Sequence, residues 1–311
     1  MSLSVRSRLP FIIVVVVLLF AAQMSAAEPT SGPQAPSGLR CEYLENPMGV
    51  DVRLPRFFWV LEHPGRGQAQ SAYQIMVSSD RGFASADLWD SGKAASPKST
   101  QVVYAGKALQ SGQTYFWRVK SWDKDGQESG WSEPARFDTG LFDRAEWKGA
   151  WIGGKNQLRK EFALEKRVKR ARAYIAGLGY HEFRINGRKA GNHVLDPGWT
   201  TYDKRVLYIT HDVTNFLRQG PNAVAVTLGN GKYGSRALLL QVDIEFEDGT
   251  KTSVVSDMTW KTAAGPILED SVYNGETYDA RLETAGWERP GFDDKAWAPA
   301  EAVKGPAGVL S

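Results

Sequence analysis

The sequence is poor in residues that form cross-links or bind transition metals. Its 311 residues include one cysteine, Cys41, so an internal disulfide framework and a multi-cysteine metal site are both excluded. No two of its four histidines stand four residues apart, which excludes the zinc-binding pattern of a helix face. We expect Cys41 to be a small buried apolar residue, because nothing near it in the sequence would activate a thiol.

The sequence also lacks an excess of charge of one sign. Lys and Arg number 38 against 35 Asp and Glu, a formal net charge of +3. Two of the positive charges, Arg6 and Arg8, lie in a segment that we expect to be removed, which leaves 36 against 35. Nucleic-acid binding driven by phosphate neutralisation is therefore not expected. The hydrophobic content of 42% is typical of a globular chain.

The sequence has one long hydrophobic run, at its N-terminus, and no later run could span a bilayer. A positively charged start precedes an apolar segment of 12 residues, 11–22, and small residues follow it at 25–27. This pattern predicts a secretory signal peptide over residues 1–27, cleaved after Ala27. An uncleaved anchor is the alternative, but a spanning helix needs roughly 20 apolar residues. We therefore expect a secreted or periplasmic bacterial protein with no membrane contact after cleavage.

Short runs that alternate between apolar and polar side chains follow a flexible leader rich in Pro, Ser and Gly, residues 28–38. In the run 114–120, Tyr115, Trp117 and Val119 face one way and their neighbours face the other. No segment shows a sustained helical period. These signals predict an all-β protein made of two tandem β-sandwiches.

The first predicted domain covers residues 39–142. Trp59 lies on its second strand, Leu109 stands six residues before Tyr115, and Trp-Ser-Glu-Pro at 131–134 precedes its last strand. These residues resemble those of a fibronectin type III module, in which Tyr115 would be the tyrosine corner, with its phenol bonded back to the chain. A sandwich of this kind hosts many functions, so this domain alone predicts no ligand.

The second predicted domain covers residues 143–311 and is typical of a jelly-roll (galactose-binding-like) sandwich. Residues 247–250 carry a hairpin signal, and residues 214–218 read as one helical turn stopped by Gly220. Asn186 followed by Gly187 predicts a type I′ turn, because both central residues of that turn need a positive φ.

The sharpest motifs of this domain follow one another in a definite order. They are Ile-Asn-Gly-Arg at 185–188, Leu-Asp-Pro-Gly-Trp-Thr at 195–200, Tyr-Asp-Lys-Arg-Val-Leu-Tyr at 202–208, Leu-Gly-Asn-Gly-Lys-Tyr at 228–233, Tyr-Asn-Gly-Glu-Thr-Tyr-Asp-Ala-Arg at 273–281, Gly-Trp at 286–287 and Phe-Asp-Asp-Lys-Ala-Trp at 292–297. Together they resemble the N-terminal, non-catalytic half of bacterial α-L-rhamnosidases, from about residue 37 to 311. The resemblance implies a fibronectin-like sandwich and a jelly-roll domain, which a helical (α/α)₆ catalytic barrel follows in the family.

The resemblance carries no catalytic residue over to this chain. The family inverts configuration with a carboxylic acid and a carboxylate base that flank the glycosidic bond. In the family both belong to the helical barrel, and this sequence shows no block of helical periodicity. The family also usually has an aromatic residue after Gly-Asn-Gly, where this chain has Lys232. The loop therefore departs from a full sugar-stacking platform.

Five residues of the second domain are candidates for binding a sugar: Trp199, Asn230, Tyr233, Arg236 and Glu276. The aromatic residues would stack on a pyranose ring, and the others would form hydrogen bonds with its hydroxyl groups. Their turns and strand ends are the places where sandwich domains carry ligand sites. Trp199 could instead cover the core, and the loop at Asn230 could be a plain turn or donate an oxygen to Ca²⁺.

The polar cluster at 276–281 has two interpretations. On a continuous strand, Glu276 would face one side while Asp279 and Arg281 would face the other. Asp279 and Arg281 would then form an interdomain ion pair, and Glu276 would face a ligand or the barrel. We also expect an exposed apolar patch on the side that carries Arg281 and Trp287, because such patches mark a missing partner.

Calcium is the one metal that the carboxylates suggest. Four of them could ligate Ca²⁺ through oxygen: Asp196, Asp203, Glu276 and Asp279. No contiguous calcium loop is present, so we predict no cofactor and assign no metal ligand.

The sequence predicts an accessory carbohydrate-recognition or domain-docking fragment of an α-L-rhamnosidase, non-catalytic by itself. Its expected partners are rhamnose-containing glycans and a separate helical catalytic domain, and not nucleic acid. Two alternatives stay open. The chain could belong to an inverting glycoside hydrolase whose catalytic barrel is missing or separately encoded. It could also be a structural or adhesive module, which a buried Trp199 would favour.

Overall fold

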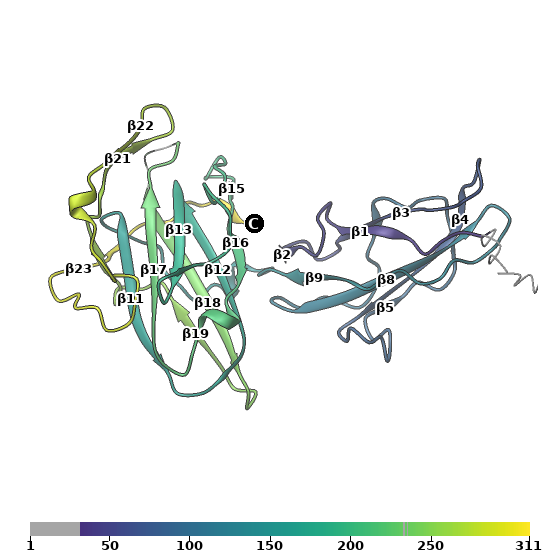
Figure 1. Ribbon diagram of the computed structural model, residues 1–311, viewed down its shortest axis with the longest axis horizontal. Coiled ribbons are helices and arrows are strands. Elements are labelled where there is room, and N and C mark those ends of the chain that lie inside the picture. The colour runs from purple at the N-terminus through teal and green to yellow at the C-terminus, as the bar shows by residue number, and fades with distance from the viewer. Residues whose placement is uncertain (1–31, 233, 235) are drawn as a thin grey trace, which may run out of the picture.

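Two β-sandwiches lie side by side along the long axis of the computed structural model (Figure 1), which describes residues 32–232, 234 and 236–311. The predicted signal peptide and Tyr233 lie outside the described residues. In the described part, the helical elements are three short 3₁₀ turns: η1 (Arg144–Glu146), η2 (Thr214–Phe216) and η3 (Ala280–Leu282). The prediction of an all-β fold is confirmed.

The first sandwich packs a small sheet against a larger one. The small sheet has the order β1 (Ser37–Cys41), β3 (Arg56–Val60), β7 (Val102–Val103). The larger sheet has the order β2 (Met48–Val50), β9 (Ala135–Thr139), β8 (Thr114–Asp123), β4 (Gln70–Ser78), β5 (Trp89–Asp90), and β6 (Ala94–Ala95) pairs with β4. Strand β8 buries Tyr115, Trp117 and Val119 in the core, as its alternation predicts.

Two buried polar side chains fix the ends of this core. The Tyr115 phenol oxygen accepts a hydrogen bond from the Gln110 backbone N–H at 2.9 Å, which confirms the predicted tyrosine corner. The Trp59 indole N–H donates to the side chain of Gln70 at 3.0 Å. Cys41 is buried, and burial raises the pKa of its thiol, so it is the inert packing residue that the sequence predicts.

The second sandwich packs two six-stranded sheets face to face. One has the order β16 (Ile209–Asp212), β12 (Val168–Leu178), β18 (Ala237–Phe246), β10 (Ile152–Gly153), β24 (Glu301–Ala302), with β19 (Lys251–Val255) beside β18. The other has the order β14 (Arg188–Lys189), β13 (Tyr180–Ile185), β17 (Gly220–Gly229), β11 (Gln157–Leu164), β20 (Lys261–Ala263), β23 (Ala298–Pro299). The chain passes from one sheet to the other at most of its turns, and Trp260, Ile175 and Leu240 fill the space between them.

The turns that the sequence predicts in this domain are present in the structure. Asn186 and Gly187 have φ angles of 52° and 80°, as a type I′ turn between β13 and β14 requires. The turn from β18 to β19 has Gly249 at a φ of 81°. The helical turn η2 ends before Gly220, whose φ is 92°.

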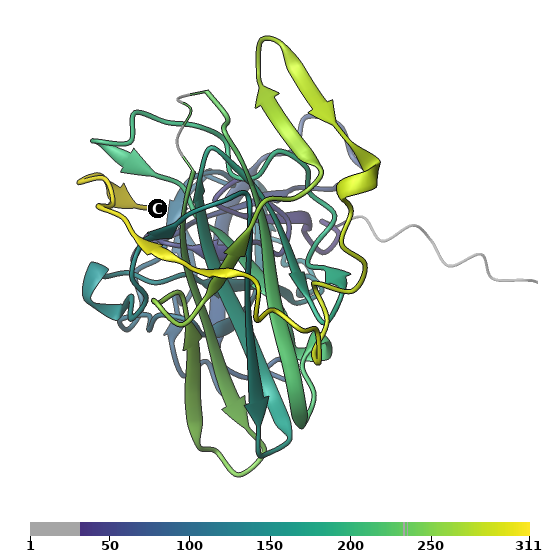
Figure 2. The same ribbon diagram turned by 90° about the vertical axis from the view of Figure 1, so that its left-hand side faces the viewer.

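A separate hairpin stands clear of one end of the second sandwich (Figure 2). It pairs β21 (Ile267–Ser271) with β22 (Gly275–Tyr278). The sequence predicts a strand that continues to Arg281, but β22 ends at Tyr278 because Asp279 caps the turn η3. The predicted interdomain ion pair is also wrong: Arg281 donates two hydrogen bonds to Asp279, at 2.8 and 2.6 Å, within this exposed segment.

A buried ion pair joins the two sandwiches. Asp138 of β9 is 1% exposed, and its carboxylate lies 3.0 Å from a guanidinium nitrogen of Arg172 on β12. Arg172 also lies 2.8 Å from Asp212 of β16, so one guanidinium links carboxylates of both domains. Its neighbour Arg170 donates to the Gly112 carbonyl oxygen of the first sandwich at 2.7 Å. The contact is therefore polar, and the two arginines of β12 supply its cations.

An aromatic cluster encloses the linker beside this ion pair. Trp147, Trp151, Tyr174 and Tyr208 are buried there around Leu141. The Tyr208 hydroxyl accepts a hydrogen bond from the Leu141 N–H at 3.0 Å. The linker is thus packed as a core where the two sandwiches meet.

The substitution Arg172→Ala leaves Asp138 charged, buried and without its main partner. We expect it to lower the free energy of unfolding by about 3–5 kcal/mol in urea titrations followed by tryptophan fluorescence. The exposed pair supplies the control, because Arg281→Ala removes a similar ion pair that water solvates, and should leave the midpoint unchanged. Adding Asp138→Asn to Arg172→Ala should recover part of the loss. Equal effects of Arg172→Ala and Arg281→Ala would contradict this account of the junction.

Candidate functional site

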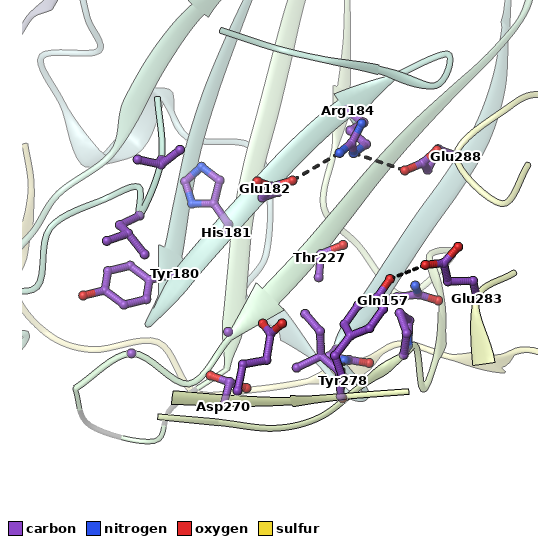
Figure 3. A pocket seen from close by; sticks show the side chains of 18 of the residues that line it. Gln157, Tyr180, His181, Glu182, Arg184, Thr227, Asp270, Tyr278, Glu283 and Glu288 are labelled. Atoms are coloured by element: carbon purple, nitrogen blue, oxygen red, sulfur yellow. Dashed lines mark hydrogen bonds and ion pairs between the residues drawn. The ribbon is translucent and has the colours of Figure 1, made fainter. Parts of the chain in front are cut away.

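A cleft of about 1120 Å³ lies between one sheet of the second sandwich and the β21–β22 hairpin (Figure 3). Its floor is a row of side chains from three neighbouring strands: Gln157 of β11, Thr227 of β17 and Glu182 of β13, which stand opposite one another in the strand register. These positions face outward because successive side chains of a strand alternate between the two faces. A polar floor under a separate hairpin is a place where a ligand can be enclosed.

Aromatic and aliphatic side chains form the walls of the cleft. Trp199 lines it and is 47% exposed, so the interpretation of Trp199 as a core residue is wrong. Val194 and Leu195 line it from the same loop, and Tyr180 and Tyr278 line it from β13 and the hairpin. An exposed indole beside polar groups can stack on an apolar ring face while hydroxyl groups meet the floor.

The charged groups of the cleft are partly paired with one another (Figure 3). Arg184 lies between Glu182, at 3.2 Å, and Glu288, at 3.1 Å. The Tyr278 hydroxyl donates to Glu283 at 2.6 Å, and this hydrogen bond raises the pKa of Tyr278. Glu276 also lines the cleft, and no cation of the described residues pairs with it.

Two predicted sugar-binding residues hold the hairpin in place. Asp270 of β21 accepts hydrogen bonds from the backbone N–H and the side chain of Asn230. Arg236 lies 2.9 Å from the same carboxylate. Asn230 and Arg236 line a smaller hollow of about 340 Å³ beside the hairpin. Contact of either residue with a sugar stays a prediction, whereas their support of Asp270 is visible.

The lysine that departs from the family motif joins the two sides of the rim. The Lys232 ammonium donates to the Tyr273 hydroxyl at 2.9 Å and lies 5.6 Å from the centre of the Trp199 ring. Its cation therefore faces the indole, an arrangement that is favourable electrostatically. Lys232 links the Trp199 loop to the tip of the hairpin.

A buried arginine anchors the opposite wall. Arg159 of β11 is 1% exposed and donates to the carbonyl oxygens of Trp287, at 2.9 Å, and Arg289, at 3.1 Å. Trp287 is itself buried and lies 5.6 Å from the ring of Trp297. The predicted apolar patch therefore does not include Trp287. Exposed apolar side chains gather instead along the hairpin and the Trp199 loop.

Sequence reasoning missed most of the floor. Glu182, Arg184, Thr227 and Gln157 stand at alternate, outward positions of strands that the sequence predicts only as runs. Within 180–185 the alternation of polar and apolar residues is a usable signal, but it does not show which strands become neighbours. Among the described residues, no three His, Cys, Asp or Glu side chains gather to hold a metal ion. No helix of the described chain is long and apolar enough to cross a membrane.

Comparison with known proteins places both sandwiches. Residues 36–143 match the family described as the Rha78A-like, N-terminal immunoglobulin domain, and residues 166–311 match the α-L-rhamnosidase N-terminal domain. The chain comprises the two N-terminal domains of the α-L-rhamnosidases. Both domains lie outside the catalytic part of that family.

Curated and solved relatives agree with this assignment. An α-L-rhamnosidase of Formosa agariphila is 37% identical over 303 residues, which cover 81% of this chain and 32% of the relative. The structure of the α-L-rhamnosidase from Dictyoglumus thermophilum superposes with a TM-score of 0.86 at 41% identity, covering 90% of this chain and 35% of that one. A Streptomyces avermitilis α-L-rhamnosidase, solved in complex with L-rhamnose, gives a TM-score of 0.84 at 26% identity, covering 89% and 46%. The chain spans about a third of the curated relatives' length.

In these rhamnosidase domains, two buried histidines lie next to the loop that carries Trp199. His181 of β13 donates its backbone N–H to the Asp196 carbonyl oxygen at 2.7 Å, which fastens that loop to the sheet. A methyl group on Gly177 would lie 2.9 Å from the His181 ring, and one on Gly191 would lie 3.0 Å from the His211 ring. Glycine at both positions thus makes room for the imidazoles.

Burial keeps both imidazoles neutral. It lowers the pKa of His181 to about 3, with His211 and Lys189 adding to the effect. Burial likewise lowers the pKa of His211 to about 4, with a smaller effect of His193. In the unfolded chain both would titrate at about 6.5. The unfolded state therefore binds more protons below that pH, and folding stability falls as the solution is acidified.

We expect each buried histidine to reduce the free energy of unfolding by about 2 kcal/mol between pH 7 and pH 5. Urea titrations at the two pH values should show a smaller loss for His211→Gln than for the unmodified chain. His193→Gln is the control, because His193 is largely exposed and its replacement should leave most of the pH dependence in place. The same pH dependence in His211→Gln and in the unmodified chain would contradict this explanation.

Proposed function

We propose that the cleft binds a rhamnose-containing glycan, and that these domains serve an α-L-rhamnosidase as an accessory carbohydrate-recognition unit. The observation that carries the proposal is the exposed Trp199 beside a polar floor in a cleft of about 1120 Å³. Pockets of this size hold drug-sized ligands, so an oligosaccharide segment fits more naturally than a single sugar.

The chemistry of the walls matches a deoxy sugar. L-Rhamnose carries hydroxyl groups on its ring, and its C5 bears a methyl group where most hexoses have a hydroxymethyl group. Val194 and Leu195 are largely exposed and offer apolar contact for such a methyl group. Trp199 offers a flat surface for the C–H face of the ring.

Unpartnered polar atoms at the floor also support a polar ligand. The Gln157 side-chain oxygen lines the cleft and is buried without a hydrogen-bond partner among the described residues. Both ring nitrogens of His181 also lack a partner there, on the inner side of the floor next to Gly177. Buried polar groups are nearly always hydrogen-bonded in folded proteins, so these atoms call for bound water or a ligand.

The proposed sugar class comes from the relatives. All four curated relatives carry the name α-L-rhamnosidase, and one solved relative is described as complexed with L-rhamnose. These domains cover about a third of the curated relatives, so hydrolysis would require residues beyond these two domains.

Truncating the indole tests the glycan site directly. We expect Trp199→Ala to weaken binding of a rhamno-oligosaccharide about tenfold in calorimetry, since stacking contributes about 1.5 kcal/mol. Tyr43→Ala is the control. The exposed fraction of Tyr43, 49%, is similar to that of Trp199, but Tyr43 belongs to the first sandwich. Absence of heat at millimolar oligosaccharide for the unmodified chain would rule out the proposed site.

A second candidate function is docking to the rest of a rhamnosidase. Among the described residues of the second sandwich, ten large hydrophobic side chains are exposed. Eight of them lie on the hairpin, its following turn or the Trp199 loop: Val194, Leu195, Trp199, Leu268, Val272, Tyr273, Tyr278 and Leu282. A concentration of this kind marks an interaction surface. An isolated two-stranded hairpin is also marginally stable in water, which favours a partner that covers it.

Docking predicts a complex in solution. The chain should co-sediment with the C-terminal two-thirds of the Formosa agariphila relative in analytical ultracentrifugation. Leu282→Ser should weaken that complex and leave the heat of glycan binding unchanged. Leu44→Ser is the control, because Leu44 is exposed on the first sandwich. If the two fragments sediment separately, the cleft rim is not a docking surface.

A further inference from the structure

We propose that the cleft selects neutral glycans and rejects glycans that carry a uronate or sulfate group beside rhamnose. The inference rests on the proposed glycan site and adds the charge class of its ligand. It follows from the way in which the cleft's ionised groups are paired, which leaves two carboxylates facing the ligand without a cation.

The cations of the cleft are already engaged. Arg184, the one arginine or lysine that lines the described cleft, lies within 3.2 Å of Glu182 and within 3.1 Å of Glu288. Arg236 is 2.9 Å from Asp270, behind the hairpin. An incoming anion would have to displace a carboxylate from one of these guanidinium groups.

Two carboxylates stay unneutralised. Glu283 accepts the hydrogen bond of the Tyr278 hydroxyl, which is a neutral donor. Glu276 stands on β22, is exposed, and has no cation beside it in the described chain. Both come from the hairpin side, so they face whatever occupies the space above the strand floor.

Lys232 at the rim does not reverse this balance. Its ammonium is bonded to the Tyr273 hydroxyl and lies over the Trp199 ring. With Lys189, which lies 2.8 Å from Glu182, and Lys232 included, the floor, the hairpin and the rim of the cleft hold four cations, Arg184, Lys189, Arg236 and Lys232. They hold five carboxylates: Glu182, Asp270, Glu276, Glu283 and Glu288. The field at the ligand position is therefore negative.

The same carboxylates favour a neutral sugar. A carboxylate accepts hydrogen bonds from sugar hydroxyl groups, and such charge-assisted bonds are stronger than neutral ones. A ligand anion brings a like charge to the same place and gains nothing in return. Rejection by like charge is a common way to build specificity into a binding site.

The experiment compares two oligosaccharides of equal length by calorimetry at low salt: a neutral rhamno-oligosaccharide and one with a uronic acid next to rhamnose. We expect the neutral ligand to bind about tenfold more tightly. The difference should shrink in about 0.5 M salt, which screens exposed charges. Glu276→Gln and Glu283→Gln should each strengthen uronate binding about threefold, since glutamine keeps the hydrogen-bonding shape and removes the charge.

Glu301→Gln is the matched control. Glu301 is an exposed glutamate on β24, outside the cleft, and its replacement should leave both affinities unchanged. All three substitutions are at partly or fully exposed positions, and circular dichroism would verify the fold of each variant. Equal or tighter binding of the uronate ligand by the unmodified chain overturns the inference and leaves the glycan site standing. Binding of neither ligand overturns the glycan site and the inference together.

Discussion

The carboxylate of Asp270 is the interaction on which the cleft depends. The β21–β22 hairpin has no strand neighbour in either sheet, so nothing in the sandwich ladders holds it. Asp270 ties it to the turn after β17 through Asn230, and to the start of β18 through Arg236, the residue directly before that strand. On the other wall, Arg159 holds the chain around Trp287 by its carbonyl oxygens. Polar anchors therefore hold both walls of the cleft in place.

The two sandwiches differ in what they contribute to the structure. The first sandwich has a closed aromatic core, a tyrosine corner and an inert buried thiol, and a hollow beside its His63 measures about 250 Å³. The second carries the floor, the walls and the hairpin. The Asp138–Arg172 pair and the aromatic cluster around Leu141 join them without a flexible segment between.

Local patterns predicted the parts of the fold that depend on neighbouring residues. The alternation at 114–120 places Tyr115 and Trp117 in the core, and Asn186-Gly187 forms its turn, because both depend on strand period and allowed φ angles. The end of β22 at Tyr278 could not be predicted in this way. There the capping carboxylate of Asp279 competes with a strand pattern that continues in the sequence.

The site itself depends on neighbours that are distant in sequence. Gln157, Glu182 and Thr227 meet only because β11, β17 and β13 stand side by side, and no spacing in the chain records that order. Trp199 could be proposed from its motif, but its exposure is decided by the loop bonded to His181. The hydrogen-bonding groups of Asn230 and Arg236 make both residues candidates, but their partner Asp270 lies 34 or more residues away and no motif points to it.

The position of the hairpin separates the cleft from the first sandwich. The β21–β22 hairpin lies on the side of the second sandwich that points away from the first (Figure 1). Every residue that lines the cleft belongs to the second sandwich, so a ligand there would meet no side chain of the first. Substitutions in the first sandwich could then reach the cleft only through the junction, where Asp138 meets Arg172.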